Sequence, residues 1–218
     1  RRLNKDYYPL MVERFVALAQ PKGSILARPL PRPSLQVDSI RVDALRDEFQ
    51  LNQQRPVLAL CPGAEFGPSK RWPEEHYTTV AREKIIQGWQ VWLLGSGKDE
   101  QVAESITSQL ESHLAEYCVV LAGKTQLADA IDLLSQADAV VSNDSGLMHI
   151  AAALQKPLVV VYGSTSPDFT PPLADRVRIE ALDVDCGPCF ERECPEGHLK
   201  CLKFLLPAQV LGALSDVV

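Results

Sequence analysis

Long apolar runs are absent from this chain, and so is an excess of positive charge. No stretch approaches the roughly 20 apolar residues of a membrane-spanning helix, and the opening residues Arg1–Asp6 are polar where a secretory signal would turn apolar. The chain has 22 Lys and Arg against 28 Asp and Glu, a net charge of −6. Because nucleic-acid backbones bind clustered cations, this charge disfavours nucleic acid as a general partner.

Methionine is also scarce, with two residues, and the chain does not begin with one, so we expect it to be a piece of a longer protein. An apolar content of 46% is too high for disorder, and 218 residues suit one large domain with or without an appendage. Six cysteines occur without a secretory signal. We therefore expect a cytosolic protein, in which metal ligands or free thiols are commoner than disulfides.

Two parts of the chain differ in pattern. Residues 1–50 contain a predicted helix over Tyr7–Gln20, the proline-rich stretch Arg28–Pro33 and a shorter predicted helix over Ser39–Phe49. Since proline is excluded from helix interiors, Arg28–Pro33 is predicted to be an extended linker. Residues 51–218 are predicted to form the domain proper.

From Arg55 onward, short apolar runs alternate with helical patterns. The predicted strands are Val57–Cys61, Gln90–Leu94, Cys118–Leu121, Ala139–Val141, Leu158–Tyr162 and Val177–Glu180. The predicted helices are Glu74–Gln87, Asp99–Leu110, Leu127–Gln136, Ser145–Leu154 and Pro207–Val217. This alternation predicts an α/β, Rossmann-like fold with a doubly wound parallel sheet, whose ligands bind beyond the carboxyl ends of the strands.

One strand-to-helix turn carries the clearest chemical signal. The apolar run Ala139–Val141 ends in small polar residues and Gly146, and an alanine-rich helical pattern follows at once. The first amides of a helix lack intrahelical acceptors and the helix dipole adds positive charge, so the turn predicts a phosphate site. The plainer interpretation is that Asp144 and Ser145 are only helix caps and that His149 is only a packed residue.

The loop after the first predicted strand, Cys61–Pro73, brings two cations to the same edge of the sheet. It is rich in Gly and Pro, which predicts an ordered loop without helix. Lys70 and Arg71 would neutralise a diphosphate, and the alternative is that both are solvated loop charges. The nearby phosphate-binding turn favours the binding role, above all for Lys70.

The loop at residues 95–100 contains two incomplete nucleotide motifs. A P-loop needs glycine where the chain has Trp92 and Ser or Thr where it has Asp99, and a dinucleotide fingerprint needs glycine in place of Glu100. Either Asp99 or Glu100 accepts ribose hydroxyls here, or the loop is a plain turn with an acidic helix start. Thr125, after the third strand, is likewise either a helix cap or a contact of the base.

Four cysteines lie close together near the end of the chain. Cys186, Cys189, Cys194 and Cys201 follow the spacing C-x2-C-x4-C-x6-C. Four thiolates on so short a loop can build a tetrahedral structural zinc site. The spacing matches no standard zinc finger, so two disulfides or buried free thiols remain equal alternatives.

Several motifs together resemble the lipopolysaccharide heptosyltransferases of glycosyltransferase family 9. The matching pieces run over nearly the whole chain, and they are Pro9–Phe15, Cys61–Pro68, Lys70–Pro73, Asn143–His149 and Tyr162–Pro167. The most specific are an Asp-(Ser/Thr)-Gly-Leu-x-His element at Asp144–His149 and a Lys-x-Trp-Pro element at Lys70–Pro73.

The resemblance implies a glycosyltransferase-B enzyme with two Rossmann-like domains. This chain would be the donor-binding, carboxyl-terminal half, with residues 1–50 leading from the junction with the missing amino-terminal domain. The donor would be ADP-L-glycero-D-manno-heptose, and the acceptor would be the lipopolysaccharide inner core, heptosyl-Kdo2-lipid A, which receives its second heptose. The enzyme would work in the cytoplasm at the inner face of a Gram-negative inner membrane, with peripheral association, and catalysis would require no cofactor.

The same resemblance implies roles for single residues. Lys70 would contact the donor phosphates, Asp144 the heptose hydroxyls, and Thr125 would lie near the adenine. Backbone amides would cradle the diphosphate with support from His149, and these amides belong to Ser145, Gly146 and Leu147.

The general base, an Asp of the amino-terminal domain in relatives, has no counterpart in this chain. The implied reaction is a single displacement with inversion, and we expect this chain alone to bind ADP without turnover. The alternative function is a complete, non-catalytic nucleotide-binding module. A nicotinamide oxidoreductase is disfavoured by the incomplete fingerprint at residues 95–100.

Overall fold

The computed structural model describes residues 3–51 and 54–218, so Arg1 and Arg2 of the predicted leading segment lie outside the described residues. The strands are β1 (Val57–Cys61), β2 (Gln90–Leu93), β3 (Cys118–Val120), β4 (Ala139–Asn143), β5 (Leu158–Tyr162) and β6 (Val177–Ala181). The helices are α1 (Met11–Ala19), α2 (Ser39–Glu48), α3 (Glu74–Ile86), α4 (Glu100–Ser108), α5 (Ser112–Ala115), α6 (Leu127–Ser135), α7 (Gly146–Ala153), α8 (Lys200–Lys203) and α9 (Pro207–Val217). Two 3-10 turns are η1 (Pro68–Lys70) and η2 (Gly97–Asp99).

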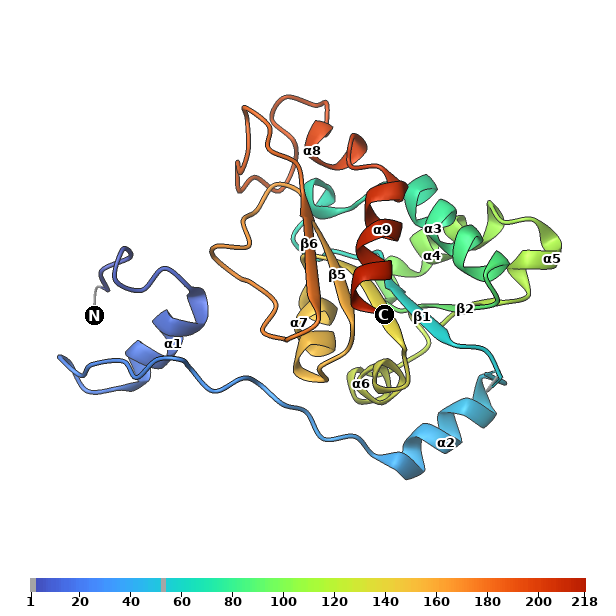
Figure 1. The fold of residues 1–218 in the computed structure, drawn as a ribbon, viewed down its shortest axis with the longest axis horizontal. Helices are drawn as coiled ribbons and strands as arrows, with labels where there is room; N and C mark the ends of the chain where they lie inside the picture. The colour runs from blue at the N-terminus through green and yellow to red at the C-terminus, as the bar shows by residue number, and fades with distance from the viewer. Residues whose placement is uncertain (1–2, 52–53) are drawn as a thin grey trace.

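The six strands form one parallel sheet in the order β3-β2-β1-β4-β5-β6, which confirms the predicted doubly wound α/β fold (Figure 1). In register, Leu60 of β1 lies beside Leu93 of β2 on one side and Val141 of β4 on the other. The chain winds outward from β1 to β3 and then returns to β4, so the order reverses between β1 and β4. In open sheets a ligand crevice forms at this reversal, beyond the carboxyl ends of the two strands.

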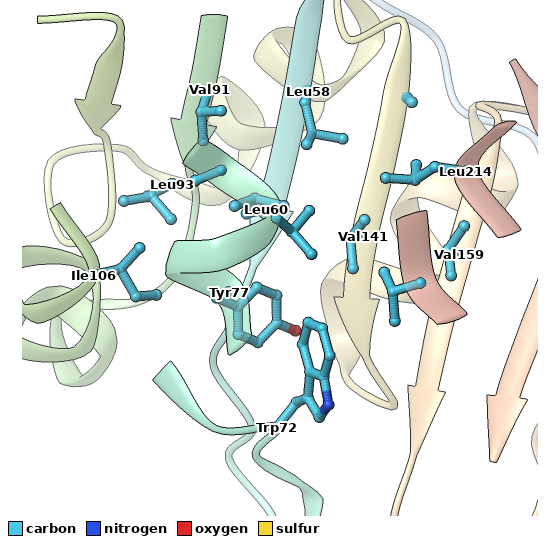
Figure 2. Close-up of a cluster of buried hydrophobic side chains, with 14 of the residues drawn as sticks. Leu58, Leu60, Trp72, Tyr77, Val91, Leu93, Ile106, Val141, Val159 and Leu214 are labelled. Atoms are coloured by element: carbon cyan, nitrogen blue, oxygen red, sulfur yellow. The ribbon is translucent and has the colours of Figure 1, made fainter. Parts of the chain in front are cut away.

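Helices cover both faces of the sheet because successive side chains of each strand point to opposite sides. On one face Leu58 and Leu60 pack with Tyr77 of α3, Ile106 of α4 and Leu214 of α9 (Figure 2). On the other face the core residues include Ala59 and Cys61 of β1, Trp92 of β2, Leu133 of α6 and Met148 of α7. Every residue of β1, β2, β4 and β5 is buried, which explains their continuous apolar sequences.

The leading segment touches the sheet domain at several places, including an ion pair between Arg32 and Asp175. Helix α1 lies apart from the sheet in Figure 1 and has its own small core of Tyr8, Ala17 and Leu26. Its first amide, that of Met11, donates to the carbonyl of Phe169 at 3.0 Å. After an extended stretch, α2 packs on α6, where Arg41 forms an ion pair with the buried Asp132. The division into residues 1–50 and 51–218 stays a prediction.

Four short elements were not predicted: α5, α8 and the two 3-10 turns η1 and η2. The four-residue helices α5 and α8 are too short to show a helical period. The loop after β1, predicted to lack helix, contains the turn η1, in which Pro68 supplies a fixed φ at the first position. Among the described residues, none of the helices combines the length and the apolarity that spanning a bilayer requires.

Candidate functional site

Three loops at the carboxyl ends of β1, β4 and β5 meet around one carboxylate. The Nζ of Lys70, at the end of η1, lies 2.5 Å from Oδ2 of Asp144, the residue after β4. The hydroxyl of Thr165, in the loop after β5, donates to the same oxygen at 2.6 Å. The side chains of Lys70 and Asp144 are only 12% and 5% exposed, so the pair is shielded from water. The sheet thus joins two predicted site residues that are far apart in sequence.

The turn between β4 and α7 leaves the helix amides without a side-chain partner. Ser145 occupies the N-cap position in an extended conformation, but its hydroxyl makes no cap bond and instead lies 3.3 Å from the hydroxyl of Ser142. The Asp144 carboxylate is also turned away from α7, toward Lys70. The plainer interpretation of both residues as side-chain caps is therefore wrong. Without a cap, the first amides of α7 remain donors for an anion.

These amides border a pocket of about 330 Å³, a size typical of small-molecule sites. Four predicted site residues line it, namely Thr125, Ser145, Gly146 and Leu147. Leu127 and Ile150 add apolar walls. Gln126, not Thr125, caps α6 by a reciprocal arrangement with Asp129, so the alternative of Thr125 as helix cap is wrong.

The loop at residues 95–100 closes on itself beside the pocket. The Oδ2 of Asp99 accepts bonds from the amide and the hydroxyl of Ser96, at 2.9 and 2.8 Å. A Cβ on Gly63 would lie 2.4 Å from the Asp99 carboxyl carbon, so only glycine fits there. Arg71 lies 3.9 Å from the other oxygen of Asp99. Asp99 lines the pocket, but its carboxylate is already hydrogen-bonded within its own turn.

His149 lies on a different hollow from the four predicted residues that line the pocket. It lines a second cavity of about 310 Å³, shared with Met11, Phe15 and Phe169. Partial desolvation lowers the pKa of His149, Asp144 raises it in opposition, and Lys70 lowers it further. The imidazole is therefore neutral near pH 7.

The glycosyltransferase family 9 (heptosyltransferase) model matches residues 1–200 of this chain. This match covers far more than half of the chain. The chain belongs to glycosyltransferase family 9.

Individual relatives agree with this family-9 assignment. In an alignment of 223 positions that includes the whole of this chain, it is 44% identical to lipopolysaccharide heptosyltransferase 2 of Salmonella typhimurium and covers 64% of that protein. It is 49% identical over 225 residues to lipooligosaccharide heptosyltransferase 2 of Haemophilus influenzae, covering 65% of it. The solved structure of E. coli ADP-heptose lps heptosyltransferase II superimposes on all of this chain with a TM-score of 0.90 at 43% identity, and 64% of that structure is covered. The chain thus spans less than two thirds of the length of these relatives.

Two further residues of the family-9 site escaped prediction. Asn143 is fully buried, accepts bonds at Oδ1 from the Trp72 amide at 3.1 Å and the Tyr77 hydroxyl at 3.0 Å, and donates to the Pro62 carbonyl. It thereby fastens the Lys70 loop to the end of β4. A polar amide at the end of an apolar strand was the available signal. Thr165 lies in the family-matching piece Tyr162–Pro167, but nothing local shows which carboxylate it meets.

The cysteine-rich segment of this family-9 chain lies beside the Lys70 loop. Cys186, Cys189, Cys194 and Cys201 are free thiols that line one small cavity. Cys61 and Cys118 lie elsewhere, in the core of the sheet domain. Burial raises the pKa of the Cys61 thiol to about 12 and that of Cys118 to about 11, so both are unreactive.

Proposed function

We propose that this chain binds ADP-L-glycero-D-manno-heptose as the donor half of a heptosyltransferase that extends the lipopolysaccharide inner core. The supporting observation is the uncapped start of α7, which opens into the pocket at the point where the strand order reverses. The resemblance to heptosyltransferases over the whole chain agrees with this donor. The enzyme would act at the cytoplasmic face of the inner membrane of a Gram-negative bacterium.

The pocket and the Lys70–Asp144 pair, which does not line the pocket itself, would contact different parts of the donor. The diphosphate would receive hydrogen bonds from the amides of Ser145, Gly146 and Leu147, with the ammonium of Lys70 beside them. Leu127 and Ile150 provide apolar surface for the adenine, next to Thr125. Both contacts of Asp144 use Oδ2, which leaves Oδ1 for the heptose hydroxyls.

The reaction would be a single displacement at the anomeric carbon. An acceptor hydroxyl oxygen bonds to that carbon as the bond to the diphosphate breaks, and the configuration inverts. Negative charge then develops on the departing ADP, where Lys70 and the α7 amides stabilise it. The base that takes the acceptor proton would come from the amino-terminal part of the enzyme. We assign no catalytic base to this chain and no metal to this step.

Calorimetry with ADP and with ADP-heptose tests the proposal. We expect both to bind, and Lys70→Met to weaken ADP binding about tenfold or more through loss of a charge-assisted hydrogen bond. NADH should give no fluorescence change. Heptosyl transfer should require the amino-terminal part in addition to this chain. A folded protein that releases no heat with ADP would refute the donor site, and turnover by this chain alone would refute the missing base.

A further inference from the structure

The proposed reaction leaves the cysteine-rich segment unused, although its four thiols share one cavity. Cys186, Cys189, Cys194 and Cys201 line a hollow of about 20 Å³, bordered by Ser69 and Ser164 from the site loops. A hollow of this size accommodates about one water molecule. The segment therefore gathers four cysteines around space for a single small occupant.

The backbone near Cys194 is arranged to stabilise a thiolate. The amide of Leu199 donates to Sγ of Cys194 at 3.4 Å, and the amide of Gly197 donates to the Cys194 carbonyl at 3.0 Å. Gly197 adopts a positive φ of 68°, which lets the chain turn around the sulfur. An N–H donor to this sulfur favours negative charge on it, and the thiolate is the form of cysteine that binds metals.

His198 completes the cluster as a hydrogen-bond donor rather than as a ligand. Its Nδ1 accepts a bond from the amide of Lys200 at 3.0 Å, so the neutral ring carries its proton on Nε2. That Nε2 lies 3.9 Å from Sγ of Cys186. An N–H directed at sulfur supports a ligating thiolate from outside the metal's own shell.

We propose that Cys186, Cys189, Cys194 and Cys201 bind one structural Zn²⁺ ion. Four thiolates form the tetrahedral, closed donor set that zinc prefers, with no position open for catalysis. In residues 3–51 and 54–218, no three His, Cys, Asp or Glu side chains already stand in a metal-binding arrangement. The site thus forms when the thiols rotate toward the cavity that they share, as ligands do in domains whose metal binding is coupled to local folding.

The ion would hold this segment against the loops of the donor site. The Phe190 amide donates to the carbonyl of Ser164 at 2.7 Å, and the Ser69 amide donates to the carbonyl of Arg192 at 3.2 Å. A Cβ on Gly67 would lie 2.4 Å from that same Arg192 carbonyl oxygen, so the contact is close. Ser69 and Ser164 are the chain neighbours of Lys70 and Thr165. The existence of the zinc site does not depend on the proposed function.

Metal analysis of the purified protein tests the proposal. We expect about one zinc per chain, retained through gel filtration, and four thiols that react with a thiol reagent only after the metal is removed. Cys189→Ser and Cys194→Ser should lose the zinc, whereas Cys118→Ala, which alters a core thiol outside the cluster, should retain it.

Cobalt substitution keeps the test decisive if the cysteine variants fail to fold. After removal of zinc, Co²⁺ added to the otherwise unaltered protein should give the visible bands of tetrahedral cobalt and a thiolate-to-cobalt charge-transfer band. Protein without zinc whose thiols react at once and bind no Co²⁺ would overturn the proposal. So would two disulfides found by mass spectrometry in protein purified under reducing conditions.

Discussion

Two strand-to-helix turns at the same edge of the sheet look alike in sequence but differ in how each uses its aspartate. After β2, the Asp99 carboxylate accepts two bonds from Ser96 of its own turn. After β4, the Asp144 carboxylate leaves its turn and meets Lys70 and Thr165 from two other loops. The first turn satisfies its own donors, whereas the second keeps its helix amides open to a ligand.

This contrast shows that small residues before a helix do not by themselves make a phosphate site. Both turns contain Ser, Gly and Asp, and both border the pocket. The destination of the acidic side chain decides which amides stay free. The Lys70–Asp144 ion pair thus determines whether the turn after β4 can bind an anion. Variants of each turn can test this idea.

The largest effect should come from breaking the Lys70–Asp144 pair. Lys70→Ala or Asp144→Ala leaves one shielded charge without a partner, which typically costs about 3–5 kcal/mol of unfolding free energy. Denaturant unfolding measures this loss, and the double variant Lys70→Met with Asp144→Leu should recover much of it. Lys98→Ala, which removes an exposed pair with Glu65, should change nothing measurable. Equal losses from Lys70→Ala and Lys98→Ala would contradict the account.

A smaller loss of stability should follow from a substitution that crowds the turn after β2. Gly63→Ala places a methyl group against the Asp99 carboxylate, so we expect a loss of about 1–3 kcal/mol from overpacking. Gly97→Ala is the matched control, because a Cβ there meets no atom within 4 Å. Thermal unfolding of both variants measures the difference, and a Gly63→Ala protein as stable as Gly97→Ala would count against the close approach.

Thr165→Val should cost still less, about 1–2 kcal/mol, because Asp144 keeps its bond to Lys70 when the hydroxyl is lost. Thr165→Ser should restore the stability, since it returns a hydroxyl at the same position. Chemical denaturation compares the three proteins. If Ser and Val are equally destabilising, the hydrogen bond to Asp144 is not the reason.

The smallest effect concerns pH. The lowered pKa of His149 means that the unfolded chain, with an ordinary value of about 6.5, binds more protons than the folded chain between the two values. Stability should therefore fall as pH falls below about 6.5 and level off below the folded pKa. His149→Gln should flatten this slope in unfolding measured from pH 7.5 to pH 5. The pKa of His76 is also lowered by desolvation, so some slope should remain in that variant. An unchanged slope would mean that His149 is not desolvated.

Much of the fold could be predicted because its strands are buried on both faces. The bounds of β1 and β5 match the predicted ranges, since continuous apolar runs between Gly, Pro and polar residues leave little choice. Helix ends were less certain, because caps depend on side-chain contacts that sequence does not show. At α6, the N-terminal cap is Gln126 and not Thr125, which the sequence offers as a cap.

The site was predictable only in part, for a related reason. The family-9 motifs mark Lys70 and Asp144, and the strand-to-helix pattern places a helix start beside them, but the absence of a side-chain cap is seen only in the structure. The pairing of these residues across 74 positions, the bond from Thr165 and the brace formed by Asn143 are tertiary contacts. His149 also follows the helical pattern, yet it lines the neighbouring hollow together with Met11 and Phe15 of α1, which the sequence does not show.

The central claim, that the first amides of α7 hold the phosphates, is tested most directly by removing one of them. Proline fits at the first helical position, and both Ser145 and Ser96 are already extended, as a residue before proline requires. We compare Gly146→Pro with Gly97→Pro by calorimetry with ADP. The account predicts an affinity about tenfold lower for Gly146→Pro, with unchanged thermal stability, and no change for Gly97→Pro. Wild-type affinity in the Gly146→Pro protein would contradict it.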